Sequence, residues 1–280
     1  MSKEEINGGD ALIRALADEK IDLIFGYPVG AALHIYDAIY KQNKVQHILV
    51  RHEQAAVHAA DGFARATGKP GVALVTSGPG ATNAITGIAT AYMDSIPVVV
   101  ISGQVASHLI GSDAFQETDM MGISRPIVKH SFLVQSAEEI PVVIKKAFHI
   151  ATSGRPGPVV IDVPQNMTDP NYKFEYKYPK ELVMRSFPIL GKGQDEKIAN
   201  AIELFRSAKK PVIYSGGGTI QADASKELTE FSKLIGCPVT NTLMGLGAFP
   251  GDDDQFVGML GMHGTYEANM VMSEADLIFN

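Results

Sequence analysis

An α/β protein built on a doubly wound parallel sheet, followed by part of a second α/β domain, is predicted by two observations. Strand-like runs of uninterrupted apolar residues alternate with segments of helical period as far as residue 164, and the alternation resumes near residue 194. A strand without polar alternation needs cover on both faces, which helices on either side of a parallel sheet supply. The length of 280 residues is enough for two cores.

The elements of the first domain are marked by their caps and turns. The helix at 53–66 is closed by Gly68 and Pro70, which are typical cap and stop signals. A strand at 21–28 ends at Gly-Tyr-Pro. The other expected elements are helices at 11–20, 31–40, 81–92 and 138–152, and strands at 45–50, 71–76, 96–103 and 157–164.

After residue 164 the pattern dissolves into a stretch rich in Pro, Lys and Tyr, which we interpret as a linker at 165–193. It separates a first domain at 1–164 from a second at 194–280. The second domain consists of helices at 195–207 and 222–235 and strands at 211–216, 237–242 and 275–280. Because a parallel sheet does not sensibly end on its last strand, we expect further chain beyond it.

The composition excludes several classes of protein. The formal net charge is -7 and no long basic run occurs, so nucleic acid is not an expected partner. The single cysteine, Cys237, fits a reducing compartment. Without a targeting peptide or a run of ~20 apolar residues, the protein is expected to be cytoplasmic, with no membrane partner.

Four segments that could carry chemistry follow predicted strands. They are Gly26–Ala31, the helix start at Glu53, the glycine-rich turn Thr76–Ala84 and the long loop Gly103–Pro126. Carboxyl ends of parallel strands meet at one edge, so we expect these segments to converge there. Taken alone, Glu53 is better explained as a helix-start acid, worth ~0.3–1 kcal/mol, than as a catalytic group.

The same segments argue against two other kinds of site. The glycine-rich turn lacks a P-loop lysine and a G-x-G-x-x-G pattern, so classical nucleotide phosphate binding is not predicted. Asp113, Glu117 and Asp119 in the long loop form no metal-ligand pattern, and no metal site is predicted within these residues.

A family resemblance is carried by the strings FGYPVGA, RHEQAAVHAADGFARATGKPGVALVTSGPGATNAITGIATAYMDSIPVVVISGQ, IGSDAFQETD and GRPGPVVIDVP. Together they resemble the large catalytic subunit of acetolactate synthase, or acetohydroxyacid synthase, a thiamine-diphosphate-dependent family. The resemblance covers essentially the whole chain. It implies a pyrimidine-binding domain at 1–164 and the first part of a central FAD-binding domain at 194–280. The family's pyrophosphate-binding domain, with its Mg2+ ligands, is expected outside these residues.

The resemblance also assigns residues at the thiamine site. Glu53 matches the glutamate that hydrogen-bonds N1′ of the aminopyrimidine and so promotes loss of the proton from thiazolium C2. Gly30 and Gln116 match the other expected catalytic positions. Phe115 and Gln116 are expected to bind substrate. The turn near the pyrimidine is matched by Pro79 and Asn83, whereas His52, His58 and Arg65 gain no catalytic role and are interpreted as structural.

A second set of residues is implied for FAD, which is mainly structural in this family because the net reaction is not redox. Arg155 matches an arginine near the flavin. The other matching positions are Gly216, Gly217, Gly218, Thr242, Leu243, Met244, Leu260, Gly261, Met262 and His263.

The activity implied by the resemblance joins two molecules of pyruvate, or pyruvate and 2-oxobutyrate, with release of CO2. This is the first common step of branched-chain amino-acid biosynthesis, leading to valine and isoleucine. A homodimer or tetramer of catalytic subunits and a small regulatory subunit are the expected partners, and this chain alone is expected to be inactive. Alternatives are another thiamine-diphosphate enzyme, such as pyruvate oxidase or glyoxylate carboligase, or a noncatalytic flavin-binding fragment. Glyoxylate carboligase is expected to lack the glutamate.

Three positions depart from the family pattern. Val29 replaces a glycine in the first turn, Ala106 stands where many members carry proline, and Gln165 stands where lysine is common. Val29 is expected to tighten the turn near the cofactor, and Gln165 removes a charge near the substrate channel. Substrate preference or inhibitor binding is the property that these changes would alter.

Overall fold

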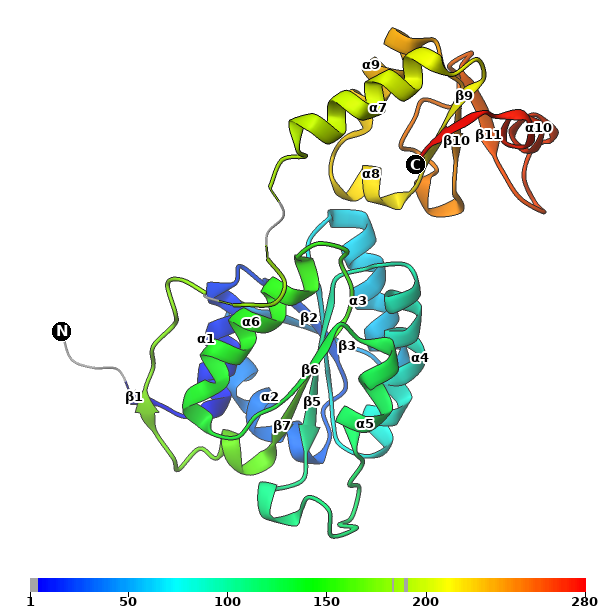
Figure 1. Ribbon diagram of the computed structural model, residues 1–280. Helices are drawn as coiled ribbons and strands as arrows, with labels where there is room; N and C mark the ends of the chain where they lie inside the picture. Colours follow the sequence, from blue (N-terminus) through cyan, green and yellow to red (C-terminus); the bar gives the residue numbers. More distant parts are fainter. Residues whose placement is uncertain (1–4, 183, 189–190) are drawn as a thin grey trace. The chain divides into compact units, whose positions relative to one another are not determined.

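The computed structural model describes residues 5–182, 184–188 and 191–280. They belong to two compact units, Met1–Ile189 and Leu190–Asn280. Each unit contains a parallel sheet with helices packed against it, and the first is doubly wound, which confirms the predicted fold class (Figure 1).

The first unit is organised by a six-stranded parallel sheet of order β3-β2-β4-β5-β7-β6. The strands are β2 Leu23–Gly26, β3 Gln46–Leu49, β4 Gly71–Val75, β5 Val98–Gln104, β6 His130–Leu133 and β7 Val159–Pro164. From β2 the chain winds outward to β3 and then returns past β2 to β4, so the strand order reverses between β2 and β4. Ligands of doubly wound sheets bind at such a reversal, beyond the carboxyl ends of the strands.

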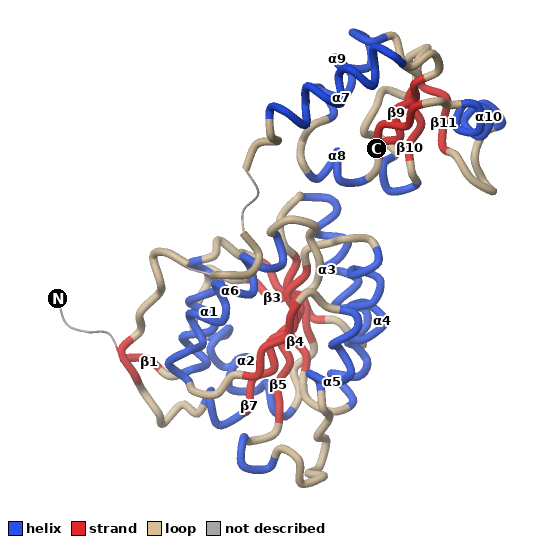
Figure 2. Tube along the Cα trace, viewed as in Figure 1, coloured by secondary structure: helices blue, strands red, loops and turns tan. Residues whose placement is uncertain are grey.

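Helices cover both faces of this sheet (Figure 2). One face carries α1 Gly8–Asp18, α2 Leu33–Tyr40 and α6 Ile140–Thr152, and the other carries α3 Glu53–Thr67, α4 Pro79–Met93 and α5 Met120–Ser124. Consecutive residues of a strand face opposite sides, so Val159 joins one hydrophobic core and Val160 the other. Every residue of β4, β5 and β7 is buried, which explains their uninterrupted apolar runs.

Helices α3 and α4 lie close together because small residues face each other. The contact includes Ala56, Ala60 and Ala84, all fully buried. At Gly87 a Cβ atom would lie 2.6 Å from Cβ of Val57, so this position leaves no room for a side chain. The close contact fixes the start of α3 relative to the first turns of α4.

Part of the expected linker is folded onto the first unit. Its two-residue strand β8 Phe174–Glu175 pairs antiparallel with β1 Glu5–Ile6. Tyr176 donates a hydrogen bond to Asp18 at 2.6 Å, and Phe174 is buried. These contacts join residues far apart in the chain, which a search for local periodicity does not detect. Strand β6 was also not expected, since its sequence HSFL is short and only half-buried.

The second unit has a four-stranded parallel sheet of order β11-β10-β9-β12. Its elements are β9 Pro211–Ser215, β10 Val239–Asn241, β11 Phe256–Met259, β12 Leu277–Phe279, α7 Asp195–Ser207, α8 Gly217–Gln221, α9 Ser225–Ile235 and α10 Tyr266–Glu274. The helix predicted at 195–207 is confirmed with the same bounds. The helix predicted at 222–235 begins later, at Ser225, and β11 and α10 were not expected.

Short 3-10 turns complete the description. They are η1 Gly30–Ala32, η2 Ser107–Leu109, η3 Arg125–Ile127, η4 Ala137–Glu139, η5 Gln165–Thr168 and η6 Leu243–Gly245. Within the described part of the chain, no helix is both long and apolar enough to cross a membrane.

Candidate functional site

The predicted site segments follow four adjacent strands of the six-stranded sheet, β3, β2, β4 and β5. The turn η1 follows β2, Glu53 opens α3 after β3, Pro79 opens α4 after β4, and the loop of residues 105–119 follows β5. All four therefore lie at the edge formed by the carboxyl ends of the strands, where the order reverses.

Glu53 is buried at the first position of α3, with 7% of its surface exposed. Nδ2 of Asn83, one turn into α4, donates a hydrogen bond to Oε2 of Glu53 at 3.0 Å. A Cβ atom at Gly80 would lie 3.1 Å from Oε1 of the carboxylate and 2.7 Å from Cγ2 of Thr76. The glycine-rich start of α4 thus lets helix backbone approach the carboxylate where a side chain would crowd it.

Gly30, Thr76 and Gln116 meet beside this carboxylate. A Cβ atom at Gly30, whose φ is +32°, would lie 3.8 Å from Oγ1 of Thr76 and 3.9 Å from Oε1 of Gln116. Gly78 has a φ of +55°, and a Cβ atom there would lie 2.5 Å from the backbone oxygen of Gln116. The turn before α4 therefore touches the backbone of the loop that follows β5.

The hydroxyl of Thr76 has no hydrogen-bond partner among the described residues, although Thr76 is 2% exposed. A Cβ atom at Gly80 would meet the methyl group of Thr76, and a Cβ atom at Gly30 would meet its hydroxyl. A buried hydroxyl without a partner is costly, which points to a ligand that completes the hydrogen bond.

The loop that carries Phe115 and Gln116 is held in place by the carboxylate of Glu117, which belongs to the same loop. Glu117 accepts hydrogen bonds from the backbone N–H groups of Gly111 and Ala114, and these bonds lower the pKa of its carboxyl. Phe115 is 87% exposed, and Gln116 adopts a φ of +58°, which is uncommon outside glycine. The ring of Phe115 thus lies on an ordered loop, exposed to solvent.

Tyr36 of α2 lies within electrostatic range of Glu53. Its hydroxyl donates to the backbone oxygen of Leu74 at 3.3 Å, and its ring packs edge-on against His47. Burial, and secondarily the negative charge of Glu53, raise the pKa of Tyr36. Tyr36 therefore stays neutral beneath the site.

The two histidines of the first segment have local partners. His52 is the N-cap of α3, and its Nδ1 accepts from the N–H of Gln54 at 3.1 Å. His58 contacts the Gln54 amide at 3.4 Å. These contacts agree with a structural role for both residues.

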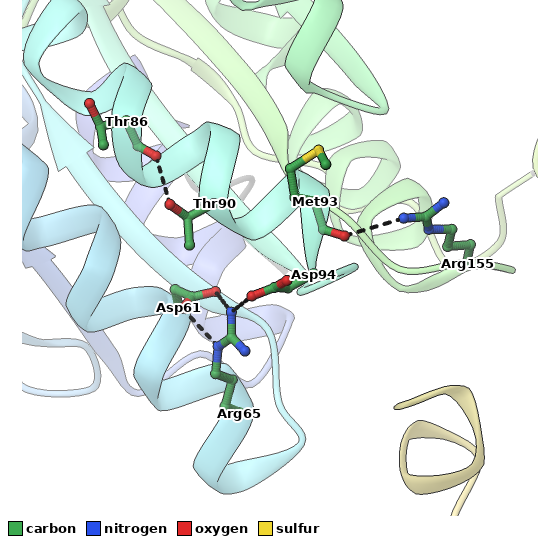
Figure 3. Close-up of polar contacts among 7 residues, drawn as sticks. All are labelled: Asp61, Arg65, Thr86, Thr90, Met93, Asp94 and Arg155. Atoms are coloured by element: carbon green, nitrogen blue, oxygen red, sulfur yellow. Dashed lines mark hydrogen bonds and ion pairs between the residues drawn. The ribbon is translucent and has the colours of Figure 1, made fainter. Parts of the chain in front are cut away.

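Arg65 and Arg155 lie at the C-terminal end of α4, beside Asp94 and Met93 (Figure 3). Arg65 bridges Asp61 and Asp94 at 2.9 and 2.6 Å, so it joins α3 to the end of α4. Nε of Arg155 donates to Oγ of Ser95 at 2.6 Å, ahead of β7 and therefore at the amino edge of the sheet. The structure does not bring Arg155 together with Glu53.

The predicted flavin positions of the second unit follow three adjacent strands, β9, β10 and β11. A Cβ atom at Gly217 would lie 3.1 Å from the backbone oxygen of Met244, so the first two segments touch. The third segment is turned at Gly261, whose φ is +107° and whose N–H donates to Asn269 at 2.9 Å. Leu243 and Met262 are exposed, at 68% and 91%.

Three buried polar residues near the thiamine-site candidates were not singled out by sequence reasoning: Thr76, Gln104 and Asp162. Thr76 and Gln104 fall within two of the predicted segments, directly after β4 and at the end of β5, whereas Asp162 lies inside the otherwise apolar strand β7. A carboxyl inside the apolar run VVIDVP could have been noticed, because such groups are rarely buried without a partner.

The arrangement as a whole is an α/β unit with a buried carboxylate, a polar hydroxyl and close backbone at the reversal of a parallel sheet. Sequence profiles of two families match the chain. Residues 6–123 match "Thiamine pyrophosphate enzyme, N-terminal TPP binding domain", and residues 198–280 match "Thiamine pyrophosphate enzyme, central domain". The chain therefore belongs to the thiamine pyrophosphate enzyme family.

Within this family the chain is similar to acetolactate synthase large subunits. It is 61% identical to that of Buchnera aphidicola subsp. Acyrthosiphon pisum over 276 residues, which is 99% of this chain and 48% of the relative. It is 58% identical to that of Haemophilus influenzae over 275 residues, 98% of this chain and 48% of the relative. It is also 58% identical to "Acetolactate synthase isozyme 3 large subunit" of Escherichia coli over 276 residues, 99% of this chain and 48% of the relative. The chain spans about half the length of these relatives.

Proposed function

We propose that this chain provides the pyrimidine-binding domain, residues 1–164, and part of a flavin-binding domain, residues 194–280, of an acetolactate synthase catalytic subunit. The observation that carries the proposal is the buried carboxylate of Glu53, which accepts from Asn83 at 3.0 Å beside Gly30 and Gln116. Identities of 58–61% to acetolactate synthase large subunits support the same reaction.

The residues at the sheet edge fit the aminopyrimidine of thiamine diphosphate. The glycine turn leaves space beside the carboxylate that a side chain would fill, and Glu53 offers that carboxylate to the edge of the ring. When bound, thiamine diphosphate supplies a carbon nucleophile that adds to a keto group and accepts the electrons left by loss of CO2. Glu53 holds a proton at N1′ of the ring, and Asn83 keeps the carboxylate in the orientation that this requires.

In the proposed substrate pocket, Gly30 leaves space beside the reacting centre. Gln116 supplies an amide for the polar end of a keto acid, and Phe115 covers its apolar end and excludes water. Pyruvate is the proposed donor, with pyruvate or 2-oxobutyrate as acceptor, and the reaction is the first common step of valine and isoleucine biosynthesis.

FAD is proposed for the second unit, at the carboxyl ends of β9, β10 and β11. There the close approach of Gly217 to Met244 suits an extended dinucleotide. Oδ1 of Asn241, fully buried at the end of β10, has no partner among the described residues, which fits a ligand at this edge. Arg155 remains a proposed flavin contact. Mg2+ and the diphosphate are proposed to bind residues outside this chain.

The proposed assembly is a homodimer or tetramer of catalytic subunits with a small regulatory subunit, in the cytoplasm. That the relatives are large subunits supports a smaller partner. The changes at Val29, Ala106 and Gln165 lie near the proposed pocket in the chain, and substrate preference is the property in which we expect their effect.

Glu53→Gln in the full-length protein tests this proposal. Loss of proton handling is expected to lower acetolactate formation from pyruvate by about 10²-fold or more, while flavin absorbance is retained. Glu139→Gln is the matched control, because Glu139 is also a helix-start acid but lies next to α6 on the other face. Wild-type turnover by Glu53→Gln, or turnover by the parent protein without thiamine diphosphate, would show that the proposal is wrong.

A further inference from the structure

A buried network joins both ends of the loop of residues 105–119 to strand β7. Nε2 of Gln104, the last residue of β5, donates to Oδ2 of Asp162 at 2.9 Å and to the backbone oxygen of Thr118 at 2.8 Å. Oε1 of the same side chain accepts from the N–H of Val105 at 2.9 Å. One amide therefore holds the first residue of the loop and a residue next to its last.

Asp162 anchors this amide from an apolar setting. Gln104 is 3% exposed and Asp162 is 1% exposed, and Ser102 lies directly opposite Asp162 in the neighbouring strand. Burial raises the pKa of Asp162 to about 7, against the hydrogen bonds from Gln104 and Ser102, and the charge of Asp119 acts in the same direction as burial. Oδ1 of Asp162 has no partner within the described residues.

This carboxyl is costly to bury, so its position calls for a reason. A buried polar atom without a partner costs stability, and an apolar side chain of similar size would avoid that cost at a strand position surrounded by hydrophobic residues. Groups kept in such surroundings are often linked to function. Among the described residues the side chain of Asp162 bonds to Gln104 and not to Glu53, so a direct catalytic role is not indicated.

The loop connects the residues held by Gln104 to Gln116 in the proposed pocket. Thr118 is two residues from Gln116, and the backbone of Gln116 rests against Gly78. Between them, Glu117 is bonded to the N–H groups of Gly111 and Ala114, so the tip of the loop is a single braced turn. Gln104 holds the base of this turn through its hydrogen bond to Thr118.

We propose that Asp162 is a positioning residue which, through Gln104, holds the loop of residues 105–119 so that Gln116 rests against Gly78 and Gly30. The kinetic consequence rests on the proposed function, because it assumes that Gln116 meets the keto acid. The structural consequence does not depend on that assumption.

The variants separate anchoring from general stability. Asp162→Ala removes the acceptor for the Gln104 amide, whereas Asp162→Asn keeps a carbonyl oxygen at the same place. Asp61→Ala is the matched control, since Asp61 is also a buried carboxylate, 7% exposed, but pairs with Arg65 on α3. Gln104→Met keeps the length of the side chain but removes the amide, and it replaces Asp162→Ala as the test of anchoring if Asp162→Ala does not fold.

Hydrogen exchange on the full-length protein without substrate is the first measurement. Asp162→Ala or Gln104→Met is expected to speed exchange of the Val105 amide and of the amides at 111–118 about tenfold, the scale of one lost hydrogen bond. Asp162→Asn should stay within about twofold of the parent, and Asp61→Ala should leave the loop unchanged. Equal loop exchange in the parent and Asp162→Ala, or an equal rise in Asp61→Ala, would overturn the proposal.

Steady-state kinetics with pyruvate is the second measurement. Asp162→Ala is expected to lower kcat/KM about tenfold, chiefly through KM, with recovery in Asp162→Asn. A fall confined to kcat, or no recovery in Asp162→Asn, would contradict the proposed route through Gln116. If the parent protein does not convert pyruvate, the proposed function is wrong, whereas the exchange comparison still decides whether Asp162 positions the loop.

Discussion

The contact between α3 and α4 can be tested with one substitution at two positions, Gly87→Ala and Gly62→Ala. At Gly87 the new Cβ would lie 2.6 Å from Cβ and 2.8 Å from Cγ1 of Val57, well inside the ~3.5–4.0 Å of favourable carbon contacts. The resulting overpacking costs about 1–3 kcal/mol, and the helix propensity of alanine returns ~1 kcal/mol, so the net loss is about 0–2 kcal/mol.

Gly62 lies in the middle of α3, is exposed, and has nothing within 4 Å of the added Cβ. There the same substitution should stabilise the helix by ~0.5–1 kcal/mol. The two variants are thus expected to differ by about 0.5–3 kcal/mol in the free energy of unfolding.

Calorimetric unfolding of the parent and both variants measures this difference. A unit of this size moves about 2–4 °C in Tm per kcal/mol, so Gly87→Ala should melt below Gly62→Ala by roughly 1–12 °C. Because α4 carries Asn83, Gly87→Ala should also weaken the orientation of Glu53 and lower turnover, whereas Gly62→Ala should not. If Gly87→Ala melts at or above Gly62→Ala, the two helices are not in the tight contact described here.

Two further predictions concern buried charge. The pKa of Asp162 is about 7 in the folded protein against 3.8 as the reference, so the folded state keeps the proton longer and loses stability as pH rises through this window. At ~1.4 kcal/mol per pH unit the full loss of stability is about 4 kcal/mol. Asp162→Asn should therefore melt progressively higher than the parent as the pH rises from about 4 to about 7, and a constant difference in Tm would count against this prediction. Arg65→Met leaves Asp61 without its cation and should lower the free energy of unfolding by about 1–3 kcal/mol in a thermal melt. Lys69→Met, at an exposed position just beyond α3, is the control and should lower it by less than ~0.5 kcal/mol. Equal losses in the two variants would contradict a stabilising ion pair between Arg65 and Asp61.

The elements that could be predicted from sequence are those whose cause is local. Strands β4, β5 and β7 are buried on both faces, and largely unbroken runs of apolar residues therefore predict them directly. The helix at 195–207 begins and ends where its amphipathic pattern does. Strands β1 and β8 were missed because each has two residues and exists only by pairing with the other, across about 170 residues of chain.

The site was predictable to the extent that topology decides it. Gly30, Glu53 and Gln116 each follow a strand, and a parallel sheet brings such residues to one edge whatever the details of packing. The position of Arg155 at the opposite edge follows from the same rule, because it precedes its strand. Sequence reasoning did not single out Thr76, Gln104 or Asp162, because the structural role of each depends on which side chains it contacts from neighbouring strands.

Two buried carboxyls near the carboxyl edge of the sheet, Glu53 and Asp162, have the same functional group in different surroundings. Each carboxyl accepts from a side-chain amide: Glu53 from Asn83 at 3.0 Å, and Asp162 from Gln104 at 2.9 Å. Glu53 stands at the start of α3, next to the glycine-rich start of α4 where the proposed ligand would bind. Asp162 lies inside the sheet with 1% of its surface exposed, and there burial favours the neutral acid. The first surroundings suit a group that exchanges a proton with a cofactor, and the second suit a group that holds a loop still. The different roles proposed for Glu53 and Asp162 therefore follow from their surroundings and not from the carboxyl group that they share.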